Sequence, residues 1–241
     1  MKRKALPLLF AVVLAASTQA SIFKTNLIDP FTTFQIISTN NATVTNTVAA
    51  TSIGGFRTLI LSTPGASLIP TVLGVDDTVQ EFVLNSPTGI TPSFEVLWGG
   101  AGGTNGLGGV AFGDGLNLDL GASFLSFGLG FADQPSSYTW KFTDTANNSA
   151  TYTGTFPQLQ PPNPPLTNNI SLNSFSNAAG IDWNAIDFIS FSGGNVASVD
   201  INGIAPFEVI ASVPEPGTWA LLATGLGLTA LVLRRKANPR H

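Results

Sequence analysis

The 241-residue chain has no cysteine, and its only histidine is the last residue, His241. Without cysteine, disulfides, thiolate nucleophiles, iron–sulfur clusters and cysteine zinc sites are excluded. Without an internal histidine, neither a Ser-His-Asp triad nor a multi-histidine metal centre can form. Whatever the chain does, it does without thiolate or imidazole chemistry.

Charge is also scarce, at 10% of residues, whereas 44% are hydrophobic and the mean hydropathy is +0.29. This balance excludes intrinsic disorder caused by high net charge. Residues 21–213 contain three cations, Lys24, Arg57 and Lys141, against thirteen acidic residues, which gives 3 − 13 = −10. A body this acidic repels phosphate backbones, so nucleic acid is excluded as a main partner.

The N-terminus has the three parts of a secretory signal peptide. Lys2-Arg3-Lys4 is followed by the apolar run Ala5–Ala16, and small residues then lead to Ala20. Twelve apolar residues are short for a membrane span, which needs about 20. We therefore predict that residues 1–20 are a signal peptide, which signal peptidase removes by cutting near Ala20.

The C-terminus combines a proline-flanked carboxylate, an apolar segment and a basic cluster. Val213–Gly217 (VPEPG) precedes sixteen apolar or small residues, 218–233, and then Arg234, Arg235 and Lys236. The two prolines fix the backbone of the tripeptide in an extended form that cannot join a helix behind it. We predict a transmembrane helix at 218–233 whose transfer stops at the three cations, which leaves a cytoplasmic tail at 237–241.

This arrangement resembles the PEP-CTERM sorting signal of Gram-negative bacteria, a segment also labelled the ice-binding protein C-terminal domain. The resemblance covers Val213–Lys236, about a tenth of the chain. It implies that an exosortase, a membrane transpeptidase-like enzyme often encoded beside exopolysaccharide genes, recognises Pro214, Glu215 and Pro216. The expected path is export through the inner membrane as an anchored precursor, then release to the cell surface or medium. The resemblance implies nothing firm about residues 21–212.

The body of the chain reads as short strands. Residues 137–143 alternate aromatic and polar side chains, and a turn at 147–149 leads into a second strand at 151–156. Further predicted strands are 56–61, 79–84, 94–98, 123–129, 186–191 and 196–201. Strands of this length separated by Gly, Pro, Asn and Ser predict an all-β fold, a single antiparallel β-sandwich of jelly-roll type at 21–212. The proline-rich stretch 157–165 is predicted to be a loop inside it, because the 47 residues that follow are too few to fold alone.

Two sets of residues are candidates for ligand contact. Asp114, Asn117 and Asp119 bring oxygen atoms close together, as a calcium site requires, although their spacing is not that of an EF-hand. Trp98 and Trp183 lie near predicted turns and are candidates for glycan contact, whereas alternation assigns Trp140 to the core. Solvated turn carboxylates are the simpler interpretation of the acidic set, so we expect no cofactor, with calcium as the alternative.

Threonine recurs at alternate positions in two segments, 43–47 and 151–155. Alternate residues of a strand lie about 6.7 Å apart on one face. Regular threonine arrays occur on ice-binding surfaces, but threonine also favours exposed strand faces in general, and two isolated triplets are not an array. The triplets therefore indicate exposed strand faces.

Three functions from different classes fit these observations. The first is a non-enzymatic structural or adhesive surface protein associated with exopolysaccharide or biofilm matrix. The alternative is a carbohydrate-binding β-sandwich. The second alternative is a secreted glycoside hydrolase, which needs two carboxyl groups at a defined separation that a sequence cannot reveal.

Overall fold

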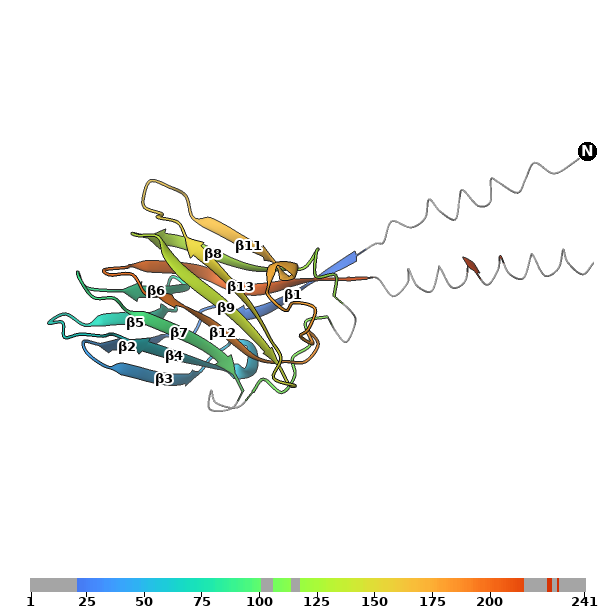
Figure 1. The fold of residues 1–241 in the computed structure, drawn as a ribbon, viewed down its shortest axis with the longest axis horizontal. Coiled ribbons are helices and arrows are strands. Elements are labelled where there is room, and N and C mark those ends of the chain that lie inside the picture. The colour runs from blue at the N-terminus through green and yellow to red at the C-terminus, as the bar shows by residue number, and fades with distance from the viewer. Residues whose placement is uncertain (1–20, 101–105, 114–117, 215–224, 227–228, 230–241) are drawn as a thin grey trace, which may run out of the picture. The chain divides into compact units, whose positions relative to one another are not determined.

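The computed structural model describes residues 21–100, 106–113, 118–214, 225–226 and 229 (Figure 1). It is an all-β structure of two stacked sheets, which confirms the predicted antiparallel β-sandwich. Residues Lys24–Ser212 form one compact unit. Loop 157–165 lies within this unit and connects a strand of one sheet to a strand of the other.

The seven-stranded sheet has the order β11-β8-β13-β6-β5-β2, with β1 paired to β13 beside this path. Its strands are β1 (Ser21–Asp29), β2 (Gln35–Thr39), β5 (Thr71–Asp76), β6 (Glu81–Asn85), β8 (Phe124–Ala132), β11 (Leu166–Ser171) and β13 (Ile201–Pro214).

The six-stranded sheet has the order β10-β9-β12-β7-β4-β3, and all its neighbouring strands are antiparallel. Its strands are β3 (Thr43–Ala49), β4 (Phe56–Ser62), β7 (Ser93–Gly99), β9 (Ser136–Asp144), β10 (Ser149–Phe156) and β12 (Ile186–Gly194). The described connections include the short 3-10 helices Ile53–Gly55 and Leu172–Ser174.

Six predicted strands coincide with β4, β7, β8, β9, β10 and β12, and two predictions need correction. The predicted strand 79–84 begins only at Glu81, because Gln80 has φ 56° and closes a turn. The predicted strand 196–201 is wrong except for Ile201, the first residue of β13. Asn195 and Ser198 both have φ 60°, a left-handed conformation that interrupts an extended chain.

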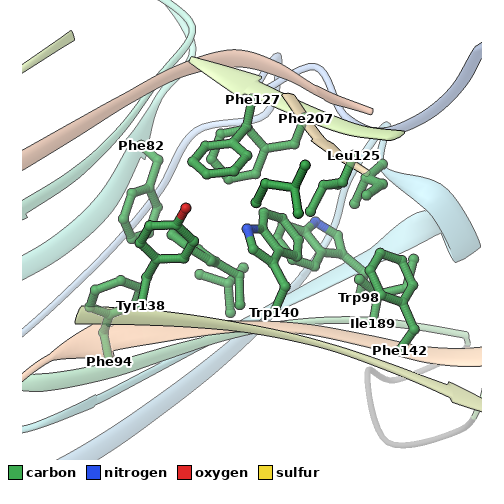
Figure 2. Close-up of a cluster of buried hydrophobic side chains, with 14 of the residues drawn as sticks. Phe82, Phe94, Trp98, Leu125, Phe127, Tyr138, Trp140, Phe142, Ile189 and Phe207 are labelled. Carbon is green, nitrogen blue, oxygen red and sulfur yellow. The ribbon is translucent and has the colours of Figure 1, made fainter. Parts of the chain in front are cut away.

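The core is a continuous aromatic cluster between the two sheets (Figure 2). Tyr138, Trp140 and Phe142 of β9 are all buried, which confirms the alternation predicted for this strand. Trp140 stacks on Trp98 with ring centroids 5.7 Å apart and planes 9° apart. Phe207 meets Trp140 edge-on from the opposite sheet at 5.5 Å. Such pairs contribute about 0.5–1.5 kcal/mol each beyond the area that they bury.

Asp144 organises the turn of the β9–β10 hairpin. Its Oδ1 accepts hydrogen bonds from the backbone N–H groups of Ala146 and Asn148, at 2.9 and 2.8 Å. Its Oδ2 accepts from the side chain of Asn148 and from the N–H of Asp182, both at 3.0 Å. Burial by itself raises the pKa of this carboxyl, but the hydrogen bonds from Asp182, Asn148 and Ala146 outweigh it, and the pKa is lowered.

Replacing Asp144 by asparagine should therefore destabilise the fold in a pH-dependent way. Because the folded pKa lies below the unfolded value of about 3.9, the charged carboxylate stabilises the fold above that pH, and this stabilisation is lost as the pH falls through the folded pKa. The expected loss at pH 7 is about 1.5–3 kcal/mol, the range for hydrogen bonds to a charged group. Urea unfolding of residues 21–214 at pH 7 and below pH 3 measures it. A difference between variant and wild type that is the same at both pH values would contradict this role of the charge.

Candidate functional site

The two tryptophans predicted to contact a glycan are both buried. The side chain of Trp98 has no exposed surface and that of Trp183 has 5%. Trp98 follows Phe94 and Val96 on the inward face of β7, and its indole Nε1 donates a hydrogen bond of 2.7 Å to Asp29 Oδ2. The prediction is therefore wrong for Trp98, because strand alternation outweighs its position near a turn.

Trp183 fails as a glycan contact for a different reason. It lies in an irregular segment, where no strand pattern indicates its direction, and packs on Phe142 and Phe175 at centroid distances of 5.3 and 6.1 Å. Its Nε1 donates to the carbonyl of Ala178 at 2.9 Å, so its polar atom is satisfied within the fold. Trp183 belongs to the core and not to a binding surface.

Only one member of the predicted calcium set lies among the described residues. Asp114 and Asn117 lie outside them, whereas Asp119 Oδ1 accepts the N–H groups of Gly121 and Ala122 at 3.0 and 3.2 Å. Within the described ranges no three Asp, Glu or His side chains gather as a metal site would require. Asp119 thus closes a turn, and calcium binding stays a prediction.

One pair of carboxylates lies where three connections meet at the end of the sandwich. The N–H of Asp200 donates to Asp133 Oδ1, and the N–H of Ser86 donates to Asp200 Oδ1, both at 2.8 Å. Burial raises the pKa of Asp200, the negative charge of Asp133 raises it further, and the hydrogen bond from Ser86 opposes both. These contacts join the turns that follow β6, β8 and β12.

Sequence reasoning missed a buried ion pair between Asp29 of β1 and Arg57 of β4. Arg57 Nη1 lies 2.8 Å from Asp29 Oδ2, and the two side chains are 0% and 1% exposed. Arg57 Nε donates to Gln35 Oε1 at 2.8 Å, and Nη2 donates to the carbonyl of Thr33. Each guanidinium nitrogen thus has an acceptor, as a buried cation requires.

The partners of Arg57 are themselves held in place. Asp29 accepts hydrogen bonds from the indole of Trp98 and, at 2.8 Å, from the N–H of Phe31. Gln35 reaches the other sheet, because its Nε2 donates to the carbonyl of Asn46 at 2.9 Å. The network joins the β1–β2 connection to strands β3, β4 and β7 of the six-stranded sheet.

The outer face of the six-stranded sheet carries mostly serine and threonine. The outward residues of the six strands align in three rows, each of which runs across the sheet from β3 to β10. Row 1 is Thr43, Ser62, Ser93, Gly194, Ser137 and Thr155. Row 2 is Thr45, Ile60, Glu95, Ser192, Thr139 and Thr153. Row 3 is Thr47, Thr58, Leu97, Ser190, Lys141 and Thr151.

Neighbouring hydroxyl groups within these rows form hydrogen bonds with one another. The Thr43 hydroxyl donates to that of Ser62 at 2.9 Å, and the Thr139 and Thr153 hydroxyls are 3.1 Å apart. The two threonine triplets predicted to lie on strand faces occupy β3 and β10, the opposite edges of this sheet. The rows form an outward face of mostly short, uncharged hydroxyl side chains, which is interrupted by Gly194, Ile60, Glu95, Leu97 and Lys141.

Most of the predicted sorting and processing residues lie outside the described part of the chain. Pro214 is described as the last residue of β13, whereas Ala20, Glu215 and Pro216 are not described. The same holds for Arg234, Arg235 and Lys236 and for most of the predicted transmembrane segment 218–233. Among the residues that are described, no helix has the length and hydropathy of a membrane span.

Comparison with known proteins identifies the C-terminal segment by its sequence motif. The family model of the PEP-CTERM protein-sorting motif matches residues 212–236. No curated protein matches the chain.

Several solved structures are similar to this chain at low scores. The family 11 carbohydrate-binding module of the cellulase Lic26A-Cel5E of Clostridium thermocellum is 11% identical, with 80% of this chain and 95% of that module covered at a TM-score of 0.37. The family 30 carbohydrate-binding module of Cel9D-Cel44B of the same organism is 13% identical, with 73% of this chain and 96% of that module covered at a TM-score of 0.38. The agarase AgWH50C is 12% identical, with 60% of this chain and 23% of the agarase covered at a TM-score of 0.40. Scores this low carry no argument about a ligand or an activity.

The matched segment begins at Ser212 and contains the whole predicted sequence of tripeptide, apolar stretch and basic cluster. The motif and the fold lie in consecutive parts of the chain, since the compact unit ends at the residue where the motif begins. The chain is therefore a β-sandwich that carries a PEP-CTERM protein-sorting motif at residues 212–236, which indicates an exported protein sorted by an exosortase.

Proposed function

We propose that the protein is a non-catalytic structural or adhesive component of the cell surface and of its exopolysaccharide matrix. Signal peptidase cuts near Ala20, and segment 218–233 holds the precursor in the inner membrane with Arg234, Arg235 and Lys236 on the cytoplasmic side. An exosortase then reads Pro214, Glu215 and Pro216 and releases residues 21–212 towards the outer surface.

The observation that carries this proposal is the sorting motif at residues 212–236. Two features of the sandwich support the structural or adhesive part. The tryptophans Trp98 and Trp183, which a carbohydrate-binding module would expose, are buried in the core. The outward face of the six-stranded sheet presents hydroxyl side chains in rows, a surface suited to many weak polar contacts with a hydrated matrix.

Deletion of the gene in a matrix-forming host tests this function against the hydrolase alternative. A structural role predicts that the matrix loses cohesion and releases cells under shear, while the chain length of its polysaccharide stays the same. A hydrolase predicts longer polysaccharide chains in the deletion strain. The measurement pairs a shear-detachment assay with size-exclusion analysis of the extracted polysaccharide.

A variant of the sorting motif serves as the matched control. Complementation with the wild-type gene should restore cohesion, and complementation with Glu215→Ala should not, because that variant is expected to stay in the inner membrane. Unchanged cohesion in the deletion strain, or a change in polysaccharide chain length, would overturn the structural role.

A further inference from the structure

The two edge strands of the six-stranded sheet lack the residues that usually prevent pairing with a further strand. The edge strand β3 reads TVTNTVA and the edge strand β10 reads SATYTGTF, so neither contains a charge or a proline. Soluble proteins commonly protect edge strands with lysine, proline or a bulge, because an exposed edge is a template for pairing with another strand. The composition of β3 and β10 therefore leaves both edges able to accept a strand.

The hydrogen-bond pattern shows which backbone groups point away from the sheet. Thr63 N–H donates to the carbonyl of Ala42, so even-numbered residues of β3 face β4 and odd-numbered ones face outward. In the same way, the bond from Asp144 N–H to the carbonyl of Asn148 directs odd-numbered residues of β10 outward. The outward backbone groups thus belong to Thr43, Thr45, Thr47 and Ala49 on β3 and to Ser149, Thr151, Thr153 and Thr155 on β10.

Part of the β10 edge is already used, and the rest of it is open. On β10, Thr151 exchanges backbone hydrogen bonds with Ser176, at 3.3 and 2.8 Å. Thr153 and Thr155 beyond it make no outward backbone hydrogen bond within the described residues, and neither do Thr43 and Thr45 of β3. The positions that are open on both edges are therefore those of rows 1 and 2, because in row 3 Thr151 of β10 is occupied.

Because the open positions of β3 and β10 lie in the same two rows, the two edges can pair with each other. The six strands alternate in direction, so β3 and β10 run antiparallel to each other. If a second copy is rotated so that its β10 continues the twisted sheet beyond β3 of the first, Thr43 of one copy faces Thr155 of the next, and Thr45 faces Thr153. Both pairs place outward N–H and C=O groups opposite each other, as an antiparallel ladder requires.

The two edges of the seven-stranded sheet are not aligned in this way. Its edge strands β2 and β11 are offset along the sheet, because Gln35 and Leu166 are the only residues of the two strands that share a row. Copies placed side by side would leave most of β2 opposite the 157–165 connection rather than opposite β11. Edge pairing is thus favoured for one sheet of the sandwich and not for the other.

We propose that a second copy of this chain is the partner of the six-stranded sheet, with the Thr43–Thr45 segment of β3 of one copy pairing with the Thr153–Thr155 segment of β10 of the next. The contact is head to tail and leaves a free edge at each end, so it continues into an open ribbon rather than a closed dimer. The inference rests on the proposed structural function and gives it a mechanism: each added copy extends the hydroxyl rows of the outer face.

The absence of native cysteine makes the contact measurable by cross-linking. Residues opposite each other in a hydrogen-bonded antiparallel pair have Cα atoms about 5.5 Å apart, within disulfide range. Within one copy Thr45 and Thr153 lie on opposite edges of a six-stranded sheet, about five strand spacings of ~4.8 Å apart, so they cannot cross-link internally. The full-length double variant Thr45→Cys/Thr153→Cys, produced in a Gram-negative host without an exosortase, is oxidised in the cell envelope and run on a non-reducing gel.

The expected result is a ladder of dimers, trimers and larger multimers. Each single variant alone should stay monomeric, and co-production of the two single variants should give dimers but no ladder. A second double variant, Thr43→Cys/Thr155→Cys, should give the same ladder, which guards against misfolding of one variant. Limited proteolysis of the reduced proteins verifies that the sandwich is intact.

The matched control places cysteines on the edges of the other sheet, in the double variant Ser38→Cys/Thr167→Cys, and should give no ladder. If both double variants of the six-stranded sheet cross-link no more than this control, the inference is overturned. Strong dimers from a single variant would overturn it too, because they indicate symmetric pairing of like edges. Since no exosortase is present, failure of sorting does not affect this result, and a ladder does not depend on the matrix function.

Discussion

Replacing Arg57 by methionine should lower the free energy of unfolding of the sandwich by about 3–5 kcal/mol. The variant leaves the Asp29 carboxylate buried with two donors, Trp98 Nε1 and the N–H of Phe31, but without its cation. It also leaves Gln35 Oε1 and the Thr33 carbonyl without the donors that they now have. Since domains are stable by about 5–15 kcal/mol, this single change removes a large share of the total.

Chemical denaturation of residues 21–214 measures the effect, with Lys141→Met as the matched control. Lys141 is an exposed cation on the outer face of β9, so the same substitution there should change stability by no more than about 0.5 kcal/mol. The double variant Arg57→Met/Asp29→Asn should be more stable than Arg57→Met alone, because it removes the unpaired charge. Equal losses for Arg57→Met and Lys141→Met would show that the ion pair does not hold the fold.

The parts of the fold that the sequence predicts correctly are those where strand alternation is regular. In β9 each buried aromatic alternates with an outward residue, so both the strand and the inward direction of Trp140 follow from the pattern. In β13 the pattern fails. Gly203 and Pro206 interrupt it, and the pairing with β8 shifts register between Ile204 and Glu208, where proline is tolerated.

The buried network around Arg57 could have been anticipated from one feature of the sequence. Arg57 has the same parity in its strand as Leu59 and Leu61, which are buried, so a cation stands at a core position. A buried cation needs a buried partner. The identity of that partner could not be predicted, because Asp29 lies 28 residues away in a strand of the other sheet and only the tertiary fold brings them together.

Replacing Glu215 by alanine should stop the protein from leaving the inner membrane. Glu215 is the only charged residue between the end of β13 and the basic cluster, and in the sequence it stands between two prolines, a residue type that fixes φ. The substitution leaves the apolar segment 218–233 and the sandwich unchanged, so insertion and folding are not expected to alter. What changes is the carboxylate of the PEP-CTERM motif that we propose the exosortase recognises.

Asp77→Ala is the matched control, because it removes one exposed carboxylate from a turn of the sandwich and leaves the motif intact. Asp77→Ala should be processed and located like the wild type. Export itself should be the same for all three proteins, because each keeps residues 1–20. Any difference between them therefore arises after translocation, at the C-terminus.

The most direct test of the sorting account is the mass and location of the protein in an exosortase-bearing host. Membrane, surface and medium fractions are separated, and the protein in each is measured by intact mass spectrometry. We predict that wild-type protein has lost its C-terminal segment and lies at the surface or in the medium, whereas Glu215→Ala keeps that segment and accumulates in the inner membrane. If both proteins have the same mass and the same distribution, the tripeptide at Pro214–Pro216 is not the sorting signal and the account is contradicted.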